Sequence, residues 1–402
     1  MRYLPALAAR NYRLFFAGQL ISLVGTWMQQ IAMVWLAYRL SDSITILGLV
    51  GFASQIPILL FSTLAGVWND RLDRRQLLLW TQALALLQAL LLFALTVLAL
   101  ATPGVLVVLA FVLGCINAVD LPARQAFVAE LIVDKADLAN AIGLNSLLMN
   151  GTRFLGPTLA GLLLAAFGEA ACFLINAASY LAVLAALASI RTVPRTPPPQ
   201  AALAAFRAGL AYAFHHPQIR GALLVVAGFS LCVTPYTILL PAFARDILAG
   251  DATIYGFLVG SAGGGSFLAA LYLALRGGRR KAAGLDRLVA RAMVGGGMAL
   301  TAFALAPGLP WSYGLLAILG GSVVLSAAGT NTLIQTAVDD AYRGRVMAIF
   351  STAFLGVAPL GSLAIGSLGE RFGVRTTLFV CGALALALGL AYWRHLRQPR
   401  AV

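Results

Sequence analysis

The chain has 402 residues, of which 61% are hydrophobic and 10% are charged, and its net charge at pH 7 is +14. Its mean hydropathy of +0.90 is more than a soluble protein of this length needs for its core, so the composition excludes a soluble globular domain and predicts a polytopic membrane protein. The charge alone would also suit a nucleic-acid-binding protein, but the cations follow the boundaries of the apolar segments, which excludes that class.

Twelve apolar segments are each long enough to cross a bilayer as a helix, which takes about 20 residues. They are too long for the strands of a membrane barrel, and the loops between them are short. An all-α bundle of membrane-spanning helices is therefore the structure that satisfies their backbone groups in lipid. In chain order the predicted spans are 14–40, 44–68, 77–101, 104–123, 138–166, 171–190, 218–244, 253–275, 286–306, 311–335, 345–368 and 374–393.

Arginine and lysine residues concentrate in alternate segments between these spans. If the N-terminus lies inside, the inner segments hold most of the 28 basic residues, and the outer segments hold Arg39, Arg245, Arg371 and Arg375. By the positive-inside rule, both termini are predicted to be cytoplasmic. The basic start of the chain lacks the short apolar core and cleavage site of a signal peptide, so we expect the first segment to remain as a span.

A charged turn, GVWNDRLDRR, separates the second and third spans. Cations beside a membrane helix are often only topology anchors, which would explain Arg74 and Arg75 but not Gly66 or Asp70. The spacing Gly-x-x-x-Asp-Arg-x-x-Arg-Arg resembles the loop signature of the major facilitator superfamily. The residues that carry the signature are Gly66, Asp70, Arg71, Arg74 and Arg75.

This resemblance implies a role for Asp70 as a gate group. In family members the corresponding acid is held by an arginine and by a helix N-terminus when the inner side is shut. The local candidates for these partners are Arg124 and the helix start near Arg345.

Asp120 is the carboxylate that falls within a predicted span, near the inner end of the fourth. Charged groups in a bilayer are costly and are functional by default, so Asp120 is a candidate for proton exchange. It is spaced i, i+4 from Arg124, but Pro122 stands between them, so we expect this pair not to form in the usual way. A solvated charge at the membrane interface is the alternative.

Arg153 lies near the middle of the fifth span. It could attract an anionic group of a substrate or hold Asp120, with Asn117 and Asn150 as hydrogen-bond partners. Alternatively, it is a packed arginine that donates to backbone carbonyls and locks the fourth and fifth helices together. We therefore take Asp70, Asp120, Arg124 and Arg153 as the candidates for proton coupling.

The same span contains NGTRFLGPTLAG, in which Gly156 and Pro157 stand between Gly151 and Gly161. The small residues would let a neighbouring helix approach closely, and the proline would bend the span. This stretch resembles the Gly-Pro motif of the superfamily's exporters, although ordinary close packing would explain it as well.

A proline-containing segment, RTVPRTPPPQ, follows the sixth span and cannot continue a helix. It predicts two six-helix bundles, 1–190 and 218–402, joined by a cytoplasmic linker, 191–217. Within the linker, an amphipathic surface helix is expected from the helical spacing of Leu203, Phe206, Leu210 and Phe214.

The two predicted bundles repeat each other weakly. ILGLVGFASQ from Ile46 parallels IYGFLVGSAG from Ile254, and Pro157 corresponds to Pro359. The acid of the charged turn is not repeated, since Asp70 corresponds to Gly278. Parallel six-helix repeats are typical of transporters in which one bundle rocks against the other around a midplane site.

A cavity for an amphipathic ligand combines apolar and aromatic walls with scattered polar groups. Residues of these types in the predicted spans are candidates for its wall, although each could equally face lipid or pack in the core. They are Trp27, Gln30, Gln55, Asn117, Asn145, Asn150, Arg153, Tyr236, Asn331, Gln335 and Phe354.

Three stretches narrow the resemblance within the superfamily: RNYRLFFAGQLISLVGTWMQQIA, NAVDLPARQAFVAEL and LANAIGLNSLLMNGTRFLGP. They resemble the branch that contains the bacterial enterobactin exporter and related drug-efflux proteins. The resemblance implies a secondary transporter of the bacterial inner membrane that exports a small amphipathic molecule by alternating access and proton antiport. The first span offers Gln29 and Gln30 where some drug exporters carry a carboxylate, which puts the usual protonation site in doubt.

Other functions remain open at this point. The same fold could serve an importer or a lipid flippase. A membrane acyl or glycosyl transferase is disfavoured because His215, His216 and His395 all fall in cytoplasmic segments, and no phosphate-binding Gly-x-x-x-x-Gly-Lys motif occurs. We expect no enzyme activity, no cofactor and no metal, and a monomer whose partners are a small-molecule substrate, protons and the lipid bilayer.

Overall fold

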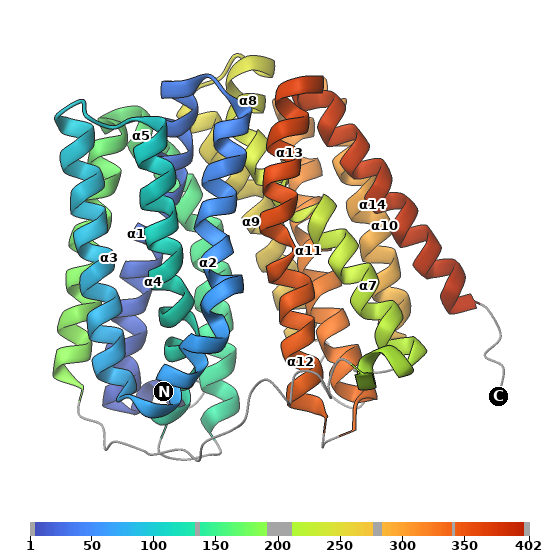
Figure 1. The fold of residues 1–402 in the computed structure, drawn as a ribbon, viewed down its shortest axis with the longest axis horizontal. Helices are drawn as coiled ribbons and strands as arrows, with labels where there is room; N and C mark the ends of the chain where they lie inside the picture. The colour runs from blue at the N-terminus through green and yellow to red at the C-terminus, as the bar shows by residue number, and fades with distance from the viewer. Residues whose placement is uncertain (1–4, 133–136, 191–210, 276–283, 340–341, 398–402) are drawn as a thin grey trace. The chain divides into compact units, whose positions relative to one another are not determined.

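The computed structural model describes residues 5–132, 137–190, 211–275, 284–339 and 342–397. Within these ranges, the side chains of 62–64, 66, 67, 70, 71, 139, 217, 218 and 344 are not described. The described part of the chain is helical throughout and contains no strand (Figure 1). Every backbone group of a long helix except those at its ends is satisfied within the helix, as a membrane interior requires.

The helices follow the predicted spans closely. The first half consists of η1 (Pro5–Ala8), α1 (Arg10–Ser41), α2 (Ile44–Arg71), α3 (Arg74–Val97), α4 (Pro103–Glu130) and α5 (Leu138–Ser189). The second half begins with α7 (Pro217–Cys232), η3 (Thr234–Leu239), α8 (Leu240–Ala242) and η4 (Phe243–Ile247). It continues with α9 (Ala252–Leu275), α10 (Leu285–Ala304), α11 (Leu309–Ala337), α12 (Arg343–Ser351), η6 (Thr352–Gly356), α13 (Ala358–Phe372) and α14 (Val374–Arg397).

The number of spans agrees with the twelve predicted. Ten helical segments of the described residues are long and apolar enough to cross a membrane, by length and composition. The longest, in α5, contains two spans that meet at Gly168, whose left-handed backbone (φ 77°) interrupts the helix. The 20-residue α10 is not among the ten, because Arg287 and Arg291 lower the hydropathy of its first turns. The all-α membrane fold is thus confirmed.

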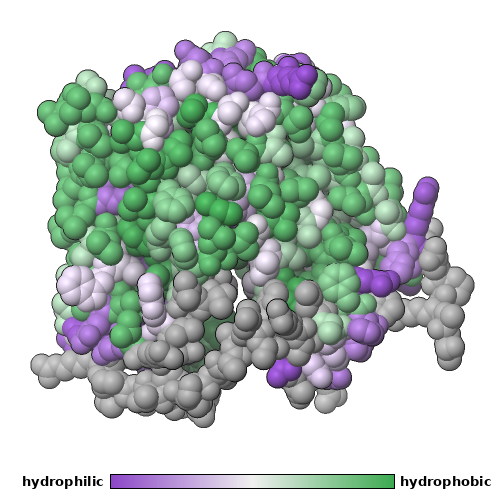
Figure 2. Space-filling model, viewed as in Figure 1, coloured by the Kyte–Doolittle hydropathy of each residue, from purple (hydrophilic) through white to green (hydrophobic). Residues whose placement is uncertain are grey.

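Side chains that face outward support the same conclusion. On the face shown in Figure 2, hydrophobic residues cover the middle of the helices, and hydrophilic residues gather at their ends. Large apolar side chains such as Trp80, Leu268 and Leu275 are 70%, 64% and 79% exposed. An apolar surface of this extent is expected where lipid rather than water surrounds the helices.

The chain divides into two compact units. Unit 1 comprises 1–42, 53–199 and 251–260, and unit 2 comprises 43–52, 200–250 and 261–402. These units differ from the predicted bundles 1–190 and 218–402 at two helices. The first part of α2 belongs to unit 2, and the first part of α9 belongs to unit 1. The connecting segment 191–210, with Leu203, Phe206 and Leu210, lies outside the described residues.

Close glycine contacts hold the first part of α2 within unit 2 and the first part of α9 within unit 1. Within unit 2, a Cβ on Gly48 of α2 would lie 2.9 Å from the Cα of Gly366 in α13. Within unit 1, a Cβ on Gly256 of α9 would lie 2.5 Å from the Cα of Gly161 in α5. Real Cβ atoms do not approach so closely, so only glycine allows these helices to touch. Gly48 and Gly256 are equivalent positions in the weak sequence repeat.

Candidate functional site

A buried carboxylate joins two helices in the interior of unit 1. Asp120 of α4 is 1% exposed, and one of its oxygens accepts hydrogen bonds from the Thr81 hydroxyl (2.9 Å) and the Gln82 amide (2.7 Å) of α3. The other oxygen forms a close ion pair with Arg124. We call Asp120, Arg124, Thr81 and Gln82 the Asp120 cluster. Three donors satisfy the charged form of the acid, as burial of a carboxylate requires.

The ion pair forms because α4 stays helical through Pro122 and continues to Glu130. Proline removes only its own N–H from the helical ladder, and the i, i+4 geometry then brings Asp120 and Arg124 to the same side of the helix. The expectation that Pro122 would prevent the usual pair is therefore wrong. The alternative of a solvated interface charge is excluded as well, because Asp120 is fully buried.

The Asp120 cluster is not completely satisfied. Among the described residues, Gln82 Oε1 and Arg124 Nε are buried and have no hydrogen-bond partner. Such atoms are rare in folded proteins and indicate strain, an internal water or a functional role. The cluster therefore has both a titratable acid and unused hydrogen-bonding capacity beside it.

A second set of buried polar groups ties α1 to α3 and to the second part of α5. The Gln29 amide donates to Gln88 (2.8 Å) and its carbonyl oxygen accepts from Asn176 (2.8 Å). Gln88 in turn donates to the Leu109 carbonyl of α4 (3.2 Å). We call Gln29, Gln88 and Asn176 the amide ladder. Its members are no more than 4% exposed, so these hydrogen bonds hold helices together away from water.

Tyr180 lies between the Asp120 cluster and the amide ladder. It is 3% exposed and lies close enough to Thr26, Asn176, Asp120 and Arg124 to interact with them electrostatically. Tyr180 is thus a polar group near both the Asp120 cluster and the amide ladder.

Two cations of the charged turn have specific partners in unit 1. Arg74 forms a close ion pair with Glu130 at the end of α4. Arg75 donates to the Leu187 and Ala188 carbonyls at the end of α5 (2.7 and 2.9 Å), where helical carbonyls lack partners. The turn itself consists of Leu72 and Asp73, and Asp73 caps α3. The surroundings of Gly66 and the side chains of Asp70 and Arg71 are outside what the structure describes, so the roles of these three residues stay predictions.

Arg153 is half-buried and forms no ion pair or hydrogen bond with the described side chains or backbone. The suggested bond to Asp120 is wrong, since Arg124, Thr81 and Gln82 take both oxygens of that acid. The Asn150 amide donates to the Ser146 carbonyl of its own helix (2.8 Å), and its oxygen accepts no hydrogen bond from Arg153. Because Arg153 has no partner among the described residues, it stays a candidate for binding an anionic group.

The Gly-Pro stretch of α5 is partly as expected. A Cβ on Gly156 would lie 2.5 Å from the Cβ of Trp27, and Gly161 meets Gly256, so both glycines allow close approach. At Gly151 a Cβ would have nothing within 4 Å, and the expected close approach is wrong there. The backbone stays helical through Pro157, and the non-helical residue of α5 is Gly168.

The other cavity candidates are divided between the two units. Trp27, Gln30, Gln55, Asn117 and Asn145 belong to unit 1; Gln30 is exposed and the others are half-buried.

In unit 2, the Gln335 amide donates to Asn331 one helical turn away (2.6 Å). Tyr236 is 4% exposed and packs in the interior. Phe354 is half-buried, and its carbonyl accepts from Ser230. That these residues line a cavity stays a prediction.

Sequence reasoning did not select most of the buried polar groups. The residues it missed are Thr81, Gln82, Gln88, Asn176 and Tyr180. Part of their signal was available, since polar side chains inside apolar spans usually face the interior of a helical bundle. The sequence does not specify, however, which faces of different helices meet.

The fold is that of a known class of membrane transporters. It resembles the crystal structure of a bacterial homologue of the iron transporter ferroportin in an inward-facing state, with a TM-score of 0.75 over 97% of this chain and 99% of that one, at 17% identity. Residues 3–401 match the transmembrane secretion effector family of the major facilitator superfamily, and the chain belongs to that family. The superfamily assignment made from the charged turn is confirmed.

Two curated relatives extend over nearly the whole chain. The staphyloferrin A transporter of Staphylococcus aureus (strain NCTC 8325 / PS 47) is 27% identical, and the match covers 94% of each protein. The multidrug efflux pump Tap of Mycolicibacterium fortuitum is 26% identical, and the match covers 91% of each.

Proposed function

We propose that this protein exports a small amphipathic molecule, siderophore-like or drug-like, across the bacterial inner membrane in exchange for protons. The family and the names of its two relatives support export, and the single observation that supports proton coupling is the buried Asp120 cluster. A transporter rather than an enzyme is also what the family describes. The fold is compatible with alternating access between two units. Driving that change with protons needs an element whose stability depends on its protonation.

Protonation of Asp120 would have large consequences inside unit 1. Neutralising the buried acid would deprive the partly buried Arg124 of its counter-ion, and breaking a buried ion pair costs about 3–5 kcal/mol. Such a change is at least as large as the ~1–3 kcal/mol by which coupled sites commonly influence each other. Because Thr81 and Gln82 belong to α3, the same event would weaken the contact between α3 and α4. Tyr180 would pass this change to the amide ladder.

Arg153 and the charged turn have separate roles in this proposal. The unpaired Arg153 attracts the anionic group of a substrate, which suits a carboxylate-bearing siderophore. Asp70 serves as the gate group that its spacing predicts, while Arg74 and Arg75 hold the start of α3 to α4 and to the end of α5. We also propose a monomer with both termini in the cytoplasm, on the basis of the cation distribution.

The orientation can be tested with single cysteines in a variant whose four native cysteines are replaced by alanine. Leu72 and Leu100 are 53% and 58% exposed and lie at opposite ends of α3. An impermeant thiol reagent added to intact cells should label Leu100→Cys and not Leu72→Cys. The reverse pattern would place the termini outside.

Export itself can be tested in inside-out vesicles from cells that produce the protein. A pH gradient, acidic inside, should drive accumulation of the transported siderophore or drug, and vesicles without the protein should not accumulate it. In cells, deletion of the gene should raise the intracellular level of the compound. A lower level after deletion would favour an importer, and movement of fluorescent phospholipid between leaflets instead would favour a flippase.

A further inference from the structure

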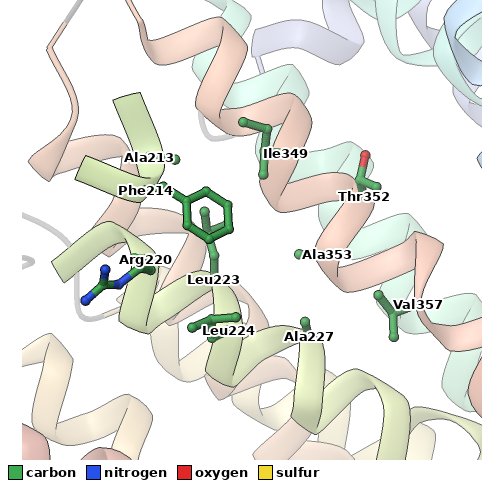
Figure 3. A pocket seen from close by; sticks show the side chains of 10 residues that line it. All are labelled: Ala213, Phe214, Arg220, Leu223, Leu224, Ala227, Ile349, Thr352, Ala353 and Val357. Carbon is green, nitrogen blue, oxygen red and sulfur yellow. The ribbon is translucent and has the colours of Figure 1, made fainter. Parts of the chain in front are cut away.

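Unit 2 contains an apolar cavity of about 250 Å³ between α7 and the segment formed by α12 and η6 (Figure 3). The helical turn 211–215 forms a third side, and the Phe214 ring lies in the gap between the two helices. The residues that line the cavity are Ala213, Phe214, Arg220, Leu223, Leu224, Ala227, Ile349, Thr352, Ala353 and Val357.

The walls of the cavity favour hydrocarbon over water. Apart from Arg220 and Thr352, the lining residues are apolar, and Thr352 donates its hydroxyl to the Ala348 carbonyl of its own helix. Apolar cavities of ~150 Å³ stay dry and bind small hydrocarbons. This cavity is larger and offers water few hydrogen-bond partners, so an alkyl chain is the group that fits it.

The local backbone builds the cavity, which is therefore more than a gap between loosely packed helices. Residues Thr352–Gly356 form a π-helix, which widens the helix by one residue and commonly occurs at functional sites. The Phe354 carbonyl in this segment accepts a hydrogen bond from Ser230 of α7. Beyond it in the chain, a Cβ on Gly361 would overlap the Leu231 carbonyl, so α7 and α13 are in close contact there.

The third wall is also held in place. The Tyr212 hydroxyl donates to Asp339 after α11 (3.0 Å), and the Tyr212 ring stacks on Tyr342 with centroids 4.3 Å apart. These contacts fix the turn that carries Phe214 against the rest of unit 2.

A cation stands at the mouth of the apolar walls. Arg220 is exposed, its guanidinium forms no hydrogen bond or ion pair with the described residues, and its side chain points away from the space between the helices. Leu224 and Phe214 beside it are 59% and 51% exposed. Gly221, next in the chain, faces His395 near the end of α14, which places the mouth at the end of unit 2 that carries the C-terminus.

We propose that this cavity binds an anionic phospholipid, with part of one acyl chain between α7 and η6 and its phosphate on Arg220. A molecule with an alkyl chain and an anionic head complements apolar walls that end in an unpaired guanidinium. If the C-terminus is cytoplasmic, which is the orientation proposed above, the mouth faces the leaflet whose surface carries the negative lipids that attract arginine. The site lies within unit 2 and does not depend on which molecule is transported.

The experiment measures the lipid that the full-length protein retains. The protein is reconstituted in nanodiscs of phosphatidylcholine and phosphatidylglycerol in equal amounts, released into mild detergent and weighed by native mass spectrometry. We expect the unmodified protein to retain phosphatidylglycerol in preference to phosphatidylcholine. Ala353→Phe, which fills the cavity, should lose the bound lipid, whereas Ala302→Phe, at an exposed position of α10, should keep it.

Arg220→Gln tests the headgroup contact separately and should fold normally because its side chain is exposed. It should lose about fivefold of the preference for phosphatidylglycerol, the effect expected of one arginine on an anionic lipid, and Arg287→Gln should lose none. Equal retention by Ala353→Phe and the unmodified protein would overturn the proposed site. An unchanged lipid preference in Arg220→Gln would overturn the anionic headgroup, and this arm remains decisive if Ala353→Phe does not fold.

Discussion

Different kinds of contact hold together the interiors of the two units. In unit 1 the buried polar side chains include an acid and several amides, and they connect different helices: Gln29, Gln82, Gln88, Asp120 and Asn176. In unit 2 the buried polar side chains of the described residues are all hydroxyls. Ser312, Ser362 and Thr377 donate to carbonyls of their own turn, while Ser230 and Ser266 donate to backbone carbonyls of other helices, those of Phe354 and Gly320. No acid or amide takes part in these contacts among the described residues of unit 2.

Unit 2 combines these hydroxyl contacts with close backbone contact. A Cβ on Gly320 would overlap the Ala262 carbonyl, and one on Gly382 would lie 2.5 Å from the Thr301 nitrogen. Phe243 and Phe303 stack in its core with centroids 4.3 Å apart. It also contains the π-helices η4 and η6.

The two units are therefore expected to respond to different events. Side-chain hydrogen bonds to a titratable acid respond to protonation, whereas glycine contacts respond to shape. We infer that unit 1 senses the proton and that unit 2 adapts to an apolar ligand.

The largest effect should come from removing the cation of the Asp120 cluster. Arg124→Ala leaves a buried carboxylate without its counter-ion, which costs about 3–5 kcal/mol. The melting temperature in detergent should fall well below that of Arg287→Ala, which removes an exposed cation. Equal melting temperatures would mean that the buried pair contributes nothing to unit 1.

A smaller but clear loss is expected where unit 2 depends on glycine. Gly320→Ala forces α9 and α11 apart, and overpacking of this kind costs about 1–3 kcal/mol. Gly314 lies in the same helix with nothing within 4 Å of its Cβ position, so Gly314→Ala should be neutral or stabilising by about 0.5–1 kcal/mol. If both variants melt alike, close backbone contact is not what holds unit 2.

The first part of α2 provides a third test, because a residue of α13 caps it within unit 2. Glu370 accepts hydrogen bonds from the Ser43 hydroxyl (3.1 Å) and from the backbone N–H groups of Ile44 (2.6 Å) and Thr45 (3.1 Å). Glu370→Ala removes a helix cap worth about 0.5–2 kcal/mol.

Hydrogen exchange at the start of α2 should therefore accelerate in Glu370→Ala. The Asp251→Ala variant, which removes the cap of α9, should instead accelerate exchange at the start of α9. Exchange that is unchanged at α2 would show that Glu370 does not hold it.

The smallest effect is expected for the ion pair between Arg39 and Glu169 (2.8 Å). Arg39 is half exposed, and such pairs contribute about 0–1 kcal/mol. Glu169→Gln should change the melting temperature less than any substitution above. A loss as large as that of Arg124→Ala would contradict the expectation that a buried ion pair contributes more to stability than an exposed one.

Much of the fold follows from the sequence, because each span must satisfy its own backbone within the bilayer. The predicted spans agree with the helices to within four residues, except that α4 continues seven residues beyond the predicted end at 123. The repeat around Ile46 and Ile254 identifies glycines that touch other helices. The sites were harder to predict. The effect of Pro122 was overestimated because a proline near one end of a long helix removes only one hydrogen bond, and the partners Thr81 and Gln82 depend on how α3 is rotated toward α4.

The most direct test of the central claim measures proton movement through Asp120. In proteoliposomes, Asp120→Asn keeps the size of the side chain and removes the titratable group, while Asp246→Asn, at an exposed position, serves as the control. We predict that Asp120→Asn abolishes substrate efflux driven by an imposed pH gradient but preserves exchange of labelled for unlabelled substrate, and that Asp246→Asn retains both. If Asp120→Asn still concentrates substrate under a pH gradient, the proton is carried elsewhere and the Asp120 cluster only holds α3 to α4.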